Sequence, residues 1–329
     1  MTAFNRAVFG AIAAVFGAIP FVQAQEAPID GVFALPGVAQ AVEGELDVTA
    51  TGPLTREIVL RFTDPASGKQ IADFDVELTQ QLHILGVDAG LTRLIHENDD
   101  ELGADGSFTA ELTFPVPGLY HIYADVVPTG FGQQVMRFDV VVGDPGDTDG
   151  SLETAAIDVA IGPIESSDGP YSVTLDASKL QADIPSEISL FVERDGAPAE
   201  DLEPYLGVSA HAVFIRAEDL AYVHAHATEA GSGDHSGHGP TAKAAPLADA
   251  GVHQHDNGEE HSDLALGNED VHAGHGPTPV AAISPAMSLH VTTPEAGRYA
   301  LWSEFIGGGE VRAVPFTIEI PEAGSHGSH

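Results

Sequence analysis

The residues with the clearest chemical potential in this sequence are its histidines. The chain has 16 histidines in 329 residues, and nine of them lie between His224 and His275. They occur in short motifs such as HAH, DHSGH, HQH and HAGH, separated by Gly, Ala, Pro, Asp and Glu. His-x-His and His-x-x-His spacings allow neighbouring imidazoles to chelate one metal ion, and nearby carboxylates add negative charge. This stretch therefore predicts transition-metal binding; a His-rich linker without a metal is the alternative.

The absence of cysteine limits which metal such a site would prefer. Without thiols the chain has no disulfides, zinc–thiolate sites or thiol nucleophiles. With only three methionines, it also lacks the sulfur ligands that Cu(I) prefers, whereas imidazole and carboxylate suit Zn(II), Cu(II) or Ni(II). We expect one of these divalent ions as the cofactor. Binding requires neutral imidazole, so affinity should fall as the pH drops through about 6.5.

The segments that must position these histidines have the pattern of β-strands. Short stretches of alternating or β-branched apolar residues end in Gly, Pro or Asp, as at 57–62, 119–127, 187–196 and 314–321. Such stretches are typical of strands, and no long helical period competes with them. The sequence therefore predicts an all-β protein.

The second half of the chain repeats the first. Four landmarks recur at a constant offset of 128 positions, and further landmarks recur at an offset of 179. The pairs at the first offset are Gly68 and Gly196, Asp73 and Asp201, His83 and His211, and His96 and His224; those at the second include Tyr120 and Tyr299, and Asp125 and Glu304. The change of offset places an insertion of 51 residues between His226 and Met287.

Each copy has the size of an immunoglobulin-like β-sandwich, with about seven short strands in roughly 100 residues. We therefore expect two tandem immunoglobulin-like domains, with a disordered His-rich insertion in the second. The expected segments are a signal peptide at 1–24, the first domain at 25–143, a linker at 144–169, the second domain at 170–321 with its insertion at about 227–285, and a His-containing tail at 322–329. A single large barrel is the alternative, which the turn-rich, charged segment at 143–153 disfavours.

In each copy, twelve residues separate two landmark histidines. If each stretch is a hairpin with a symmetric loop, the two members lie directly opposite each other, His83 with His96 and His211 with His224. Opposed side chains have Cβ atoms about 5 Å apart, close enough for both imidazoles to bind one ion. His226 follows two residues after His224, so it falls on the same face of the strand. The second copy can thus present three nitrogens to a metal ion.

The first copy presents only two nitrogens, because Asn98 stands where His226 does. Asp125 and Glu304 are candidate carboxylate partners, although solvated strand ends are the simpler expectation. Because both faces of these strands carry apolar residues, paired histidines that are merely hydrogen-bonded at a sandwich rim are the alternative to a metal site. The full set of candidate metal ligands is His83, His96, His211, His224, His226, His235, His238, His253, His255, His261, His272 and His275.

The charge and the N-terminal residues indicate where the protein acts. Fifty acidic against twelve basic residues give a formal charge of −38, which repels nucleic acid and anionic lipid and attracts cations. One positive charge at Arg6 precedes an apolar run from Ala7 to Val22 and small residues ending at Ala24. This pattern predicts a signal peptide cleaved after Ala24, with an uncleaved anchor as the alternative. We expect a periplasmic or secreted protein, without membrane insertion after cleavage and without a nucleic-acid partner.

The stretch EDLEPYLGVSAHAVFIRAEDLAYVHAH, from Glu200 to His226, resembles a signature of bacterial secreted proteins built from tandem immunoglobulin-like modules. These proteins are related to the YtkA-like group, which is often described as metal-binding. The resemblance covers both halves, but the first diverges, with Gln81-Leu82-His83 and Ile95-His96-Glu97-Asn98 in place of the fuller histidine set. It implies the fold more than an activity.

Three functions are compatible with these features. The first is an exported divalent-metal-binding protein that acts as a buffer, chaperone or resistance factor, with an envelope metal transporter or acceptor protein as partner. The second is a non-enzymatic scaffold or partner-binding module of the cell envelope. The third is a zinc hydrolase that uses His211, His224 and His226 with an open fourth position. Because the sequence has no nucleophile elbow, P-loop or dinucleotide motif, we do not expect an enzyme.

Overall fold

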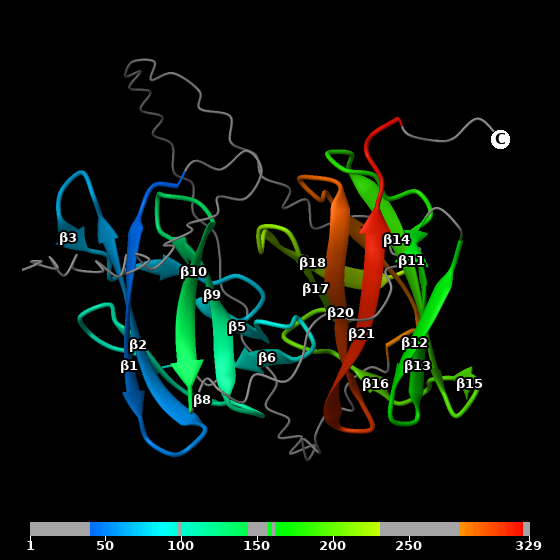
Figure 1. The fold of residues 1–329 in the computed structure, drawn as a ribbon, viewed down its shortest axis with the longest axis horizontal. Coiled ribbons are helices and arrows are strands. Elements are labelled where there is room, and N and C mark those ends of the chain that lie inside the picture. The colour runs from blue at the N-terminus through cyan, green and yellow to red at the C-terminus, as the bar shows by residue number, and fades with distance from the viewer. Residues whose placement is uncertain (1–39, 98–100, 144–156, 160–161, 231–282, 325–329) are drawn as a thin grey trace, which may run out of the picture. The chain divides into compact units, whose positions relative to one another are not determined.

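Figure 1 shows the fold of the protein in a computed structural model. The structure describes residues 40–97, 101–143, 157–159, 162–230 and 283–324, which all belong to the compact unit Gly31–His329. The predicted signal peptide at 1–24 lies outside the described residues. Most of the predicted insertion, residues 231–282, and the last five residues of the tail also lie outside the described residues, so the predicted disorder of the insertion stays a prediction.

The first half of the chain forms two antiparallel sheets, which we call the first sandwich. Its strands are β1 (Glu43–Ala50), β2 (Thr55–Asp64), β3 (Lys69–Gln70), β4 (Phe74–Asp75), β5 (Leu82–Asp88), β6 (Leu94–Glu97), β7 (Glu101–Leu102), β8 (Phe108–Thr113), β9 (Gly118–Pro128) and β10 (Gln134–Val142). One sheet has the order β1-β2-β8-β7 and the other β10-β9-β5-β6. In immunoglobulin lettering these orders are A-B-E-D and G-F-C-C′. Buried residues of both sheets, such as Phe62 and Ile122, form one core.

The second half repeats this strand order and forms what we call the second sandwich. Its strands are β11 (Ile157–Asp158), β12 (Ile164–Asp168), β13 (Tyr171–Asp176), β14 (Ser186–Arg194), β15 (Ala197–Pro198), β16 (Leu202–Glu203), β17 (Ala210–Arg216), β18 (Tyr222–Glu229), β19 (Ala286–Val291), β20 (Gly297–Gly307) and β21 (Glu310–Ile320). Nine of them follow the order β11-β21-β20-β17-β18-β19-β14-β13-β12, while β15 pairs with β14 and β16 pairs with β20. Here β18 pairs with β19, so the two layers join into one continuous sheet folded around its own core.

The all-β, immunoglobulin-like fold predicted from the sequence is confirmed, because none of the named elements is a helix and the strand order recurs in both halves. The single-barrel alternative is wrong, because the described strands of the first half form two sheets that include no strand of the second half. No helix in the described part of the chain is long and apolar enough to cross a membrane.

Two of the predicted segment boundaries need correction. β11 and β12 lie inside the linker predicted at 144–169, and they pair with β21 and β13 of the second sandwich. Residues 144–156 of that linker lie outside the described residues. The insertion predicted at about 227–285 is also shorter. β18 continues to Glu229 through pairs such as Ala227 with Leu289, and the backbone N–H of Ile283 donates to the carbonyl of Leu202.

The strands that carry the histidines have apolar residues on both faces, and both faces are buried, one in the core of its own sandwich and the other against the opposite sandwich. On β17, Ala212 and Phe214 point into the core of the second sandwich, while Val213 and Ile215 point to the opposite, outer face. Side chains from this outer face and from the matching face of the first sandwich form a separate buried cluster, which we call the interface cluster. It consists of Leu85, Val87, Leu91, Tyr123, Val135, Val213, Ile215, Tyr222, Ala300 and Trp302. Burial of this apolar area holds the two outer faces together.

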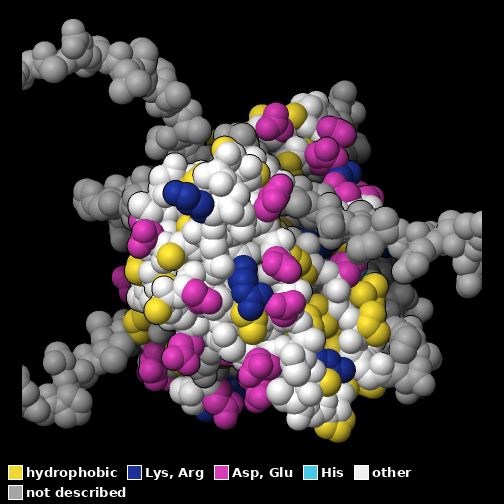
Figure 2. Space-filling view, turned by 90° about the vertical axis from the view of Figure 1, so that its left-hand side faces the viewer, with side chains coloured by type: hydrophobic (Ala, Val, Ile, Leu, Met, Phe, Trp, Pro, Cys, Tyr) yellow, Lys and Arg dark blue, Asp and Glu magenta, His cyan; other side chains and the backbone are white. Residues whose placement is uncertain are grey.

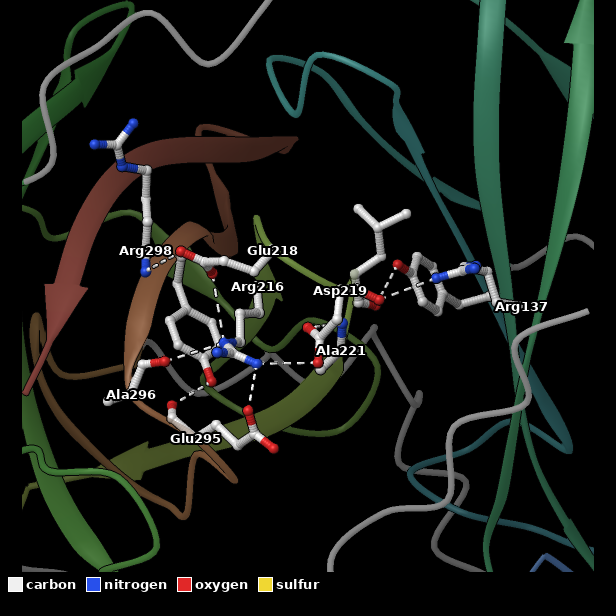
Figure 3. Close-up of polar contacts among 11 residues, drawn as sticks. Arg137, Arg216, Glu218, Asp219, Ala221, Glu295, Ala296 and Arg298 are labelled. Atoms are coloured by element: carbon white, nitrogen blue, oxygen red, sulfur yellow. Dashed lines mark hydrogen bonds and ion pairs between the residues drawn. The ribbon is translucent and has the colours of Figure 1, made fainter. Parts of the chain in front are cut away.

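Polar contacts cross the interface beside the apolar cluster. The rings of Tyr123 and Tyr222 stack with centroids 4.9 Å apart and an interplanar angle of 17°. The Tyr123 hydroxyl donates to the carbonyl of Leu220 at 2.8 Å, and the Arg137 guanidinium donates to the carbonyl of Asp219 at 3.2 Å (Figure 3). Residues of the first sandwich therefore hold the turn between β17 and β18.

Arg216 holds the same turn from within the second sandwich (Figure 3). Its guanidinium forms ion pairs with Glu218, Asp219 and Glu295, and it donates to the carbonyl of Ala296 at 3.0 Å. An arginine shared among several carboxylates loses less side-chain entropy per contact than separate exposed pairs would. This network fixes the turn, and with it the pairing of the strands that carry the histidines.

The core of the second sandwich should depend strongly on Phe214, which is fully buried. We expect Phe214→Ala to lower the free energy of unfolding by about 3–5 kcal/mol, because it leaves a cavity in packed core. Urea denaturation followed by far-UV circular dichroism measures the change. Phe191→Ala is the matched control, because that phenylalanine is 36% exposed. Equal losses for the two variants would contradict the described packing.

Candidate metal centre

The hairpin of the second sandwich pairs its histidines in a different register from the predicted one. His211 lies opposite His226, and His224 lies opposite Val213, so the predicted direct pairing of His211 with His224 is wrong. The cause is the turn: the Arg216 N–H donates to the Ala221 carbonyl, which leaves a four-residue turn centred one residue later than predicted. Leu220 in that turn has a φ of 62°, a left-handed conformation that the sequence did not signal.

The first sandwich shows the same shift. His96 lies opposite Leu85 rather than His83, and Glu97 lies opposite Ile84. In this turn, too, a leucine, Leu91, has a positive φ of 53°. A shift of the partner by two positions leaves each side chain on its original face, since the side-chain period of a strand is two. The prediction that the histidines share a face therefore survives the error in register.

The three histidines of the second sandwich lie close together, as the sequence predicted. His211, His224 and His226 each offer a ligand atom, and these atoms all lie within 4.8 Å of one another. The rings of His211 and His224 are stacked, with centroids 5.0 Å apart, and the His226 ring lies 5.0 Å and 4.6 Å from these two. Three imidazoles at such distances can be drawn onto one ion by small side-chain rotations.

The two histidines of the first sandwich join this group instead of forming the separate pair that we predicted. The centroid of the His83 ring lies 5.4 Å from that of His224, and that of His96 lies 5.7 Å from that of His211. All five side chains face the interface between the sandwiches. We call His83, His96, His211, His224 and His226 the histidine cluster.

Asp125 and Glu304 lie beside the cluster and are buried, with 2% of each residue exposed. The expectation of solvated strand ends is therefore wrong, because the outer face on which they lie is covered. Each carboxylate contacts a histidine of the other sandwich. Glu304 Oε2 lies 2.7 Å from His96 Nδ1, and Asp125 Oδ2 lies 3.8 Å from His224 Nδ1. The repeat thus produces two reciprocal histidine–carboxylate contacts across the interface.

Backbone carbonyls hold His83 and His211. His83 Nε2 lies 3.3 Å from the Glu77 carbonyl oxygen, and His211 Nε2 lies 3.1 Å from the Tyr205 carbonyl oxygen. A neutral imidazole that donates through Nε2 keeps its lone pair on Nδ1. At His211 this lone pair accepts the Nε2–H of His224 at 2.8 Å. Glu77 and Tyr205 are 128 positions apart, so the repeat pattern could have identified them, but neither was among the predicted site residues.

Several imidazole nitrogens in the cluster are buried without a partner. His83 Nδ1, His96 Nε2 and His226 Nε2 have no hydrogen-bond partner among the described residues. Leaving a buried polar atom unpaired costs about 1–3 kcal/mol. Three such atoms within one cluster are unusual for a structural polar network and are the donor type that a divalent transition metal binds.

Burial keeps four histidines of the cluster neutral. It lowers the pKa of His83 and of His226 to about 4 and that of His211 to about 2, and it holds the pKa of His224 well below the usual value. Neighbouring histidines lower these values further. Burial also raises the pKa of Asp125 to about 8. These four imidazoles are therefore uncharged at neutral pH, which is the form that binds metal.

The seven candidate ligands of the insertion cannot be placed relative to this cluster, because they lie outside the described residues. They are His235, His238, His253, His255, His261, His272 and His275.

Comparisons with known proteins identify one family model and a distantly similar solved structure. A family model described as a domain of unknown function, DUF8832, matches residues 165–322, which correspond to the second sandwich. No curated protein matches the chain. Among solved structures, a chain of the Escherichia coli adhesin FdeC is similar at 13% identity with a TM-score of 0.23. The match covers 86% of this chain and 66% of the adhesin chain, slightly under two thirds of its length.

The stability of the metal-free protein should fall as the pH drops below about 6.5, the pKa of histidine in an unfolded chain. A buried histidine with a lowered pKa stays neutral while the unfolded chain takes up a proton, so acid favours unfolding until the folded pKa is reached. For His83 and His226 this window runs from about 6.5 to about 4. Each such histidine contributes about 1.4 kcal/mol per pH unit in its window.

The raised pKa of Asp125 has the opposite sign, since its contribution to stability falls as the pH rises towards about 8. One carboxyl group does not offset four histidines below pH 6.5. Urea denaturation in the presence of a chelator, followed through the fluorescence of Trp302, measures the dependence. His226→Gln should make it shallower, while the exposed His290→Gln should leave it unchanged. A free energy of unfolding that is constant between about pH 7 and pH 5 would contradict the burial of neutral histidines.

Proposed function

We propose that the protein is an exported divalent-transition-metal-binding protein and that His211, His224 and His226 hold its ion. The observation that carries this proposal is the mutual distance of at most 4.8 Å between the ligand atoms of these three side chains. Three neutral imidazoles suit Zn(II), Cu(II) or Ni(II). The carboxylates of Asp125 and Glu304 support the same assignment, because they can balance the charge of a dication in a buried site.

The burial of the centre favours retention of an ion over catalysis. His211 is completely buried, the side chain of His224 is 2% exposed, and His226 is partly exposed with its Nε2 buried. A catalytic metal needs an open position that water and substrate can reach, whereas a storage or transport site benefits from slow release. We therefore assign the protein to metal buffering or delivery, with an envelope transporter or acceptor protein as the partner that receives the ion.

The remaining features of the chain support the proposed setting. The N-terminal pattern that ends at Ala24 supports export to the periplasm or beyond. The formal charge of −38 raises the local concentration of cations. Acidic side chains are spread across the face in Figure 2, with a few lysines and arginines among them. The histidines of the insertion would add weaker sites in the same chain.

Binding is best tested in a chain whose other histidine motifs are removed. In this tract-silenced chain, alanine replaces the histidines of the insertion and tail, His235, His238, His253, His255, His261, His272, His275, His326 and His329. Calorimetry with Zn(II) should find one ion per chain, bound more tightly than roughly 0.1 mM. His211→Ala should weaken binding by at least about tenfold, because it removes one imidazole ligand.

His290→Ala is the matched control for this experiment, because His290 is exposed on β19. It should leave the affinity unchanged. If the tract-silenced chain binds none of Zn(II), Cu(II) and Ni(II) more tightly than roughly 0.1 mM, the proposed function is wrong and a scaffold role replaces it.

A further inference from the structure

We infer that the metal ion is shared between the two sandwiches, with His83 and His96 completing the coordination that His211 and His224 begin. This inference rests on the proposed function but revises its ligand set, because His83 and His96 take the place of His226 beside His211 and His224. The ion would then bind residues of both sandwiches across the interface, and only the assembled pair of sandwiches forms the full site.

The four rings have nearly tetrahedral positions. Their six centroid separations are 6.1 Å for His83–His96, 6.2 Å for His83–His211, 5.4 Å for His83–His224, 5.7 Å for His96–His211, 6.0 Å for His96–His224 and 5.0 Å for His211–His224. The centre of such a tetrahedron lies about 3.5 Å from each ring centre, against about 3.2 Å for a ring bound through a Zn–N bond of about 2.1 Å. The ring centres would need to move inwards by only a few tenths of an ångström, but the rings of His83 and His96 would also have to turn, because among the described residues neither belongs to a group of three ligand atoms within 4.8 Å of one another.

The same nitrogens are available in both halves of the repeat. In the second sandwich, His211 Nδ1 and His224 Nε2 face each other at 2.8 Å. The matching atoms in the first sandwich are His83 Nδ1 and His96 Nε2, which are buried and have no partner among the described residues. The ring centroids of His83 and His96 are 6.1 Å apart, against 5.0 Å for His211 and His224. Among the described residues, only the histidines of the second sandwich have three ligand atoms within 4.8 Å of one another in the metal-free arrangement. An ion would therefore draw the first pair inwards.

The outer nitrogens of the same four rings face acceptors that orient metal ligands in other proteins. Ligating histidines commonly donate their second N–H to a backbone carbonyl or a carboxylate, which fixes the tautomer and the direction of the lone pair. Backbone carbonyls take this role for His83 and His211. Glu304 lies 2.7 Å from His96 Nδ1, and Asp125 lies 3.8 Å from His224 Nδ1. These two carboxylates come from the opposite sandwich, so the orienting groups cross the interface as the ligands do.

His226 stands apart from this symmetric set. Asn98 takes its place in the first half of the repeat, so only the other four histidines of the cluster occur as matching pairs in both sandwiches. A ligand set divided in this way would make metal binding and interface formation mutually dependent, because each stabilises the state that the other requires.

The test compares Zn(II) binding by variants of the tract-silenced chain. His83→Ala and His96→Ala should each weaken binding by at least about tenfold while one ion per chain still binds, and the double variant should lose more. Zn(II) should also raise the urea midpoint, read from Trp302 in the interface cluster, less in these variants than in the parent chain. His121→Ala is the matched control, because His121 is a buried histidine of the first sandwich that pairs with Asp139 at 2.6 Å. It should leave the affinity for Zn(II) unchanged.

The possible outcomes separate this inference from the proposed function. If His83→Ala and His96→Ala leave the affinity unchanged while His226→Ala lowers it, the second sandwich binds the ion alone and the sharing is wrong. Two ions per chain, falling to one in the double variant, would show separate sites and also overturn the sharing. No binding by the parent chain would overturn both proposals.

A second measurement avoids variants that fail to fold. Long-range ¹⁵N–¹H correlation spectra of the parent tract-silenced chain report the chemical shift of each imidazole nitrogen. Zn(II) should change the shifts of His83 Nδ1 and His96 Nε2 together with those of His211 Nδ1 and His224 Nε2. Unchanged nitrogens of His83 and His96 in the loaded protein would contradict the inference.

Discussion

The structure depends on one packing interaction, the burial of the outer face of one sandwich against the matching face of the other. The interface cluster supplies apolar area from both halves, including Leu85, Val213 and Trp302. Transfer of such area out of water is the main force that holds two faces together, at about 25 cal/mol per Å². The same burial removes water from the histidines and carboxylates at one end of the interface. The pKa directions, the unpaired nitrogens and the proximity of the five imidazoles all follow from it.

A desolvated cluster of this kind is costly in the absence of a ligand. Unpaired nitrogens at His83, His96 and His226 forgo hydrogen bonds that water would supply. Charging His83 or His226 would cost more, so burial lowers the pKa of both to about 4. A divalent cation reverses this balance, because it binds the neutral nitrogens and favours ionised carboxylates beside it. The binding free energy of the metal would then add to the stability of the interface.

Much of this arrangement could be predicted from the sequence. Alternating apolar residues predicted the strands, and the offset of 128 predicted the duplication of the histidine pairs. The period of two placed His211, His224 and His226 on one face even though their register was wrong, because the error was an even number of residues. The register itself depends on Leu220, whose left-handed conformation is atypical for leucine and is held by contacts from distant strands. No local sequence pattern predicts that the outer face of one sandwich is covered by that of the other. Without this cover, we expect solvated strand ends at Asp125 and Glu304 and a separate site at His83 and His96.

The central claim is that one ion contacts both sandwiches, and anomalous diffraction tests it most directly. Crystals of the tract-silenced chain, grown with Zn(II) and measured on both sides of the zinc absorption edge, locate the ion without assumptions about its ligands. The account predicts a single strong peak within about 2.1 Å of nitrogens from His83, His96, His211 and His224. A peak that contacts histidines of the second sandwich alone, or no peak in the histidine cluster, would contradict it.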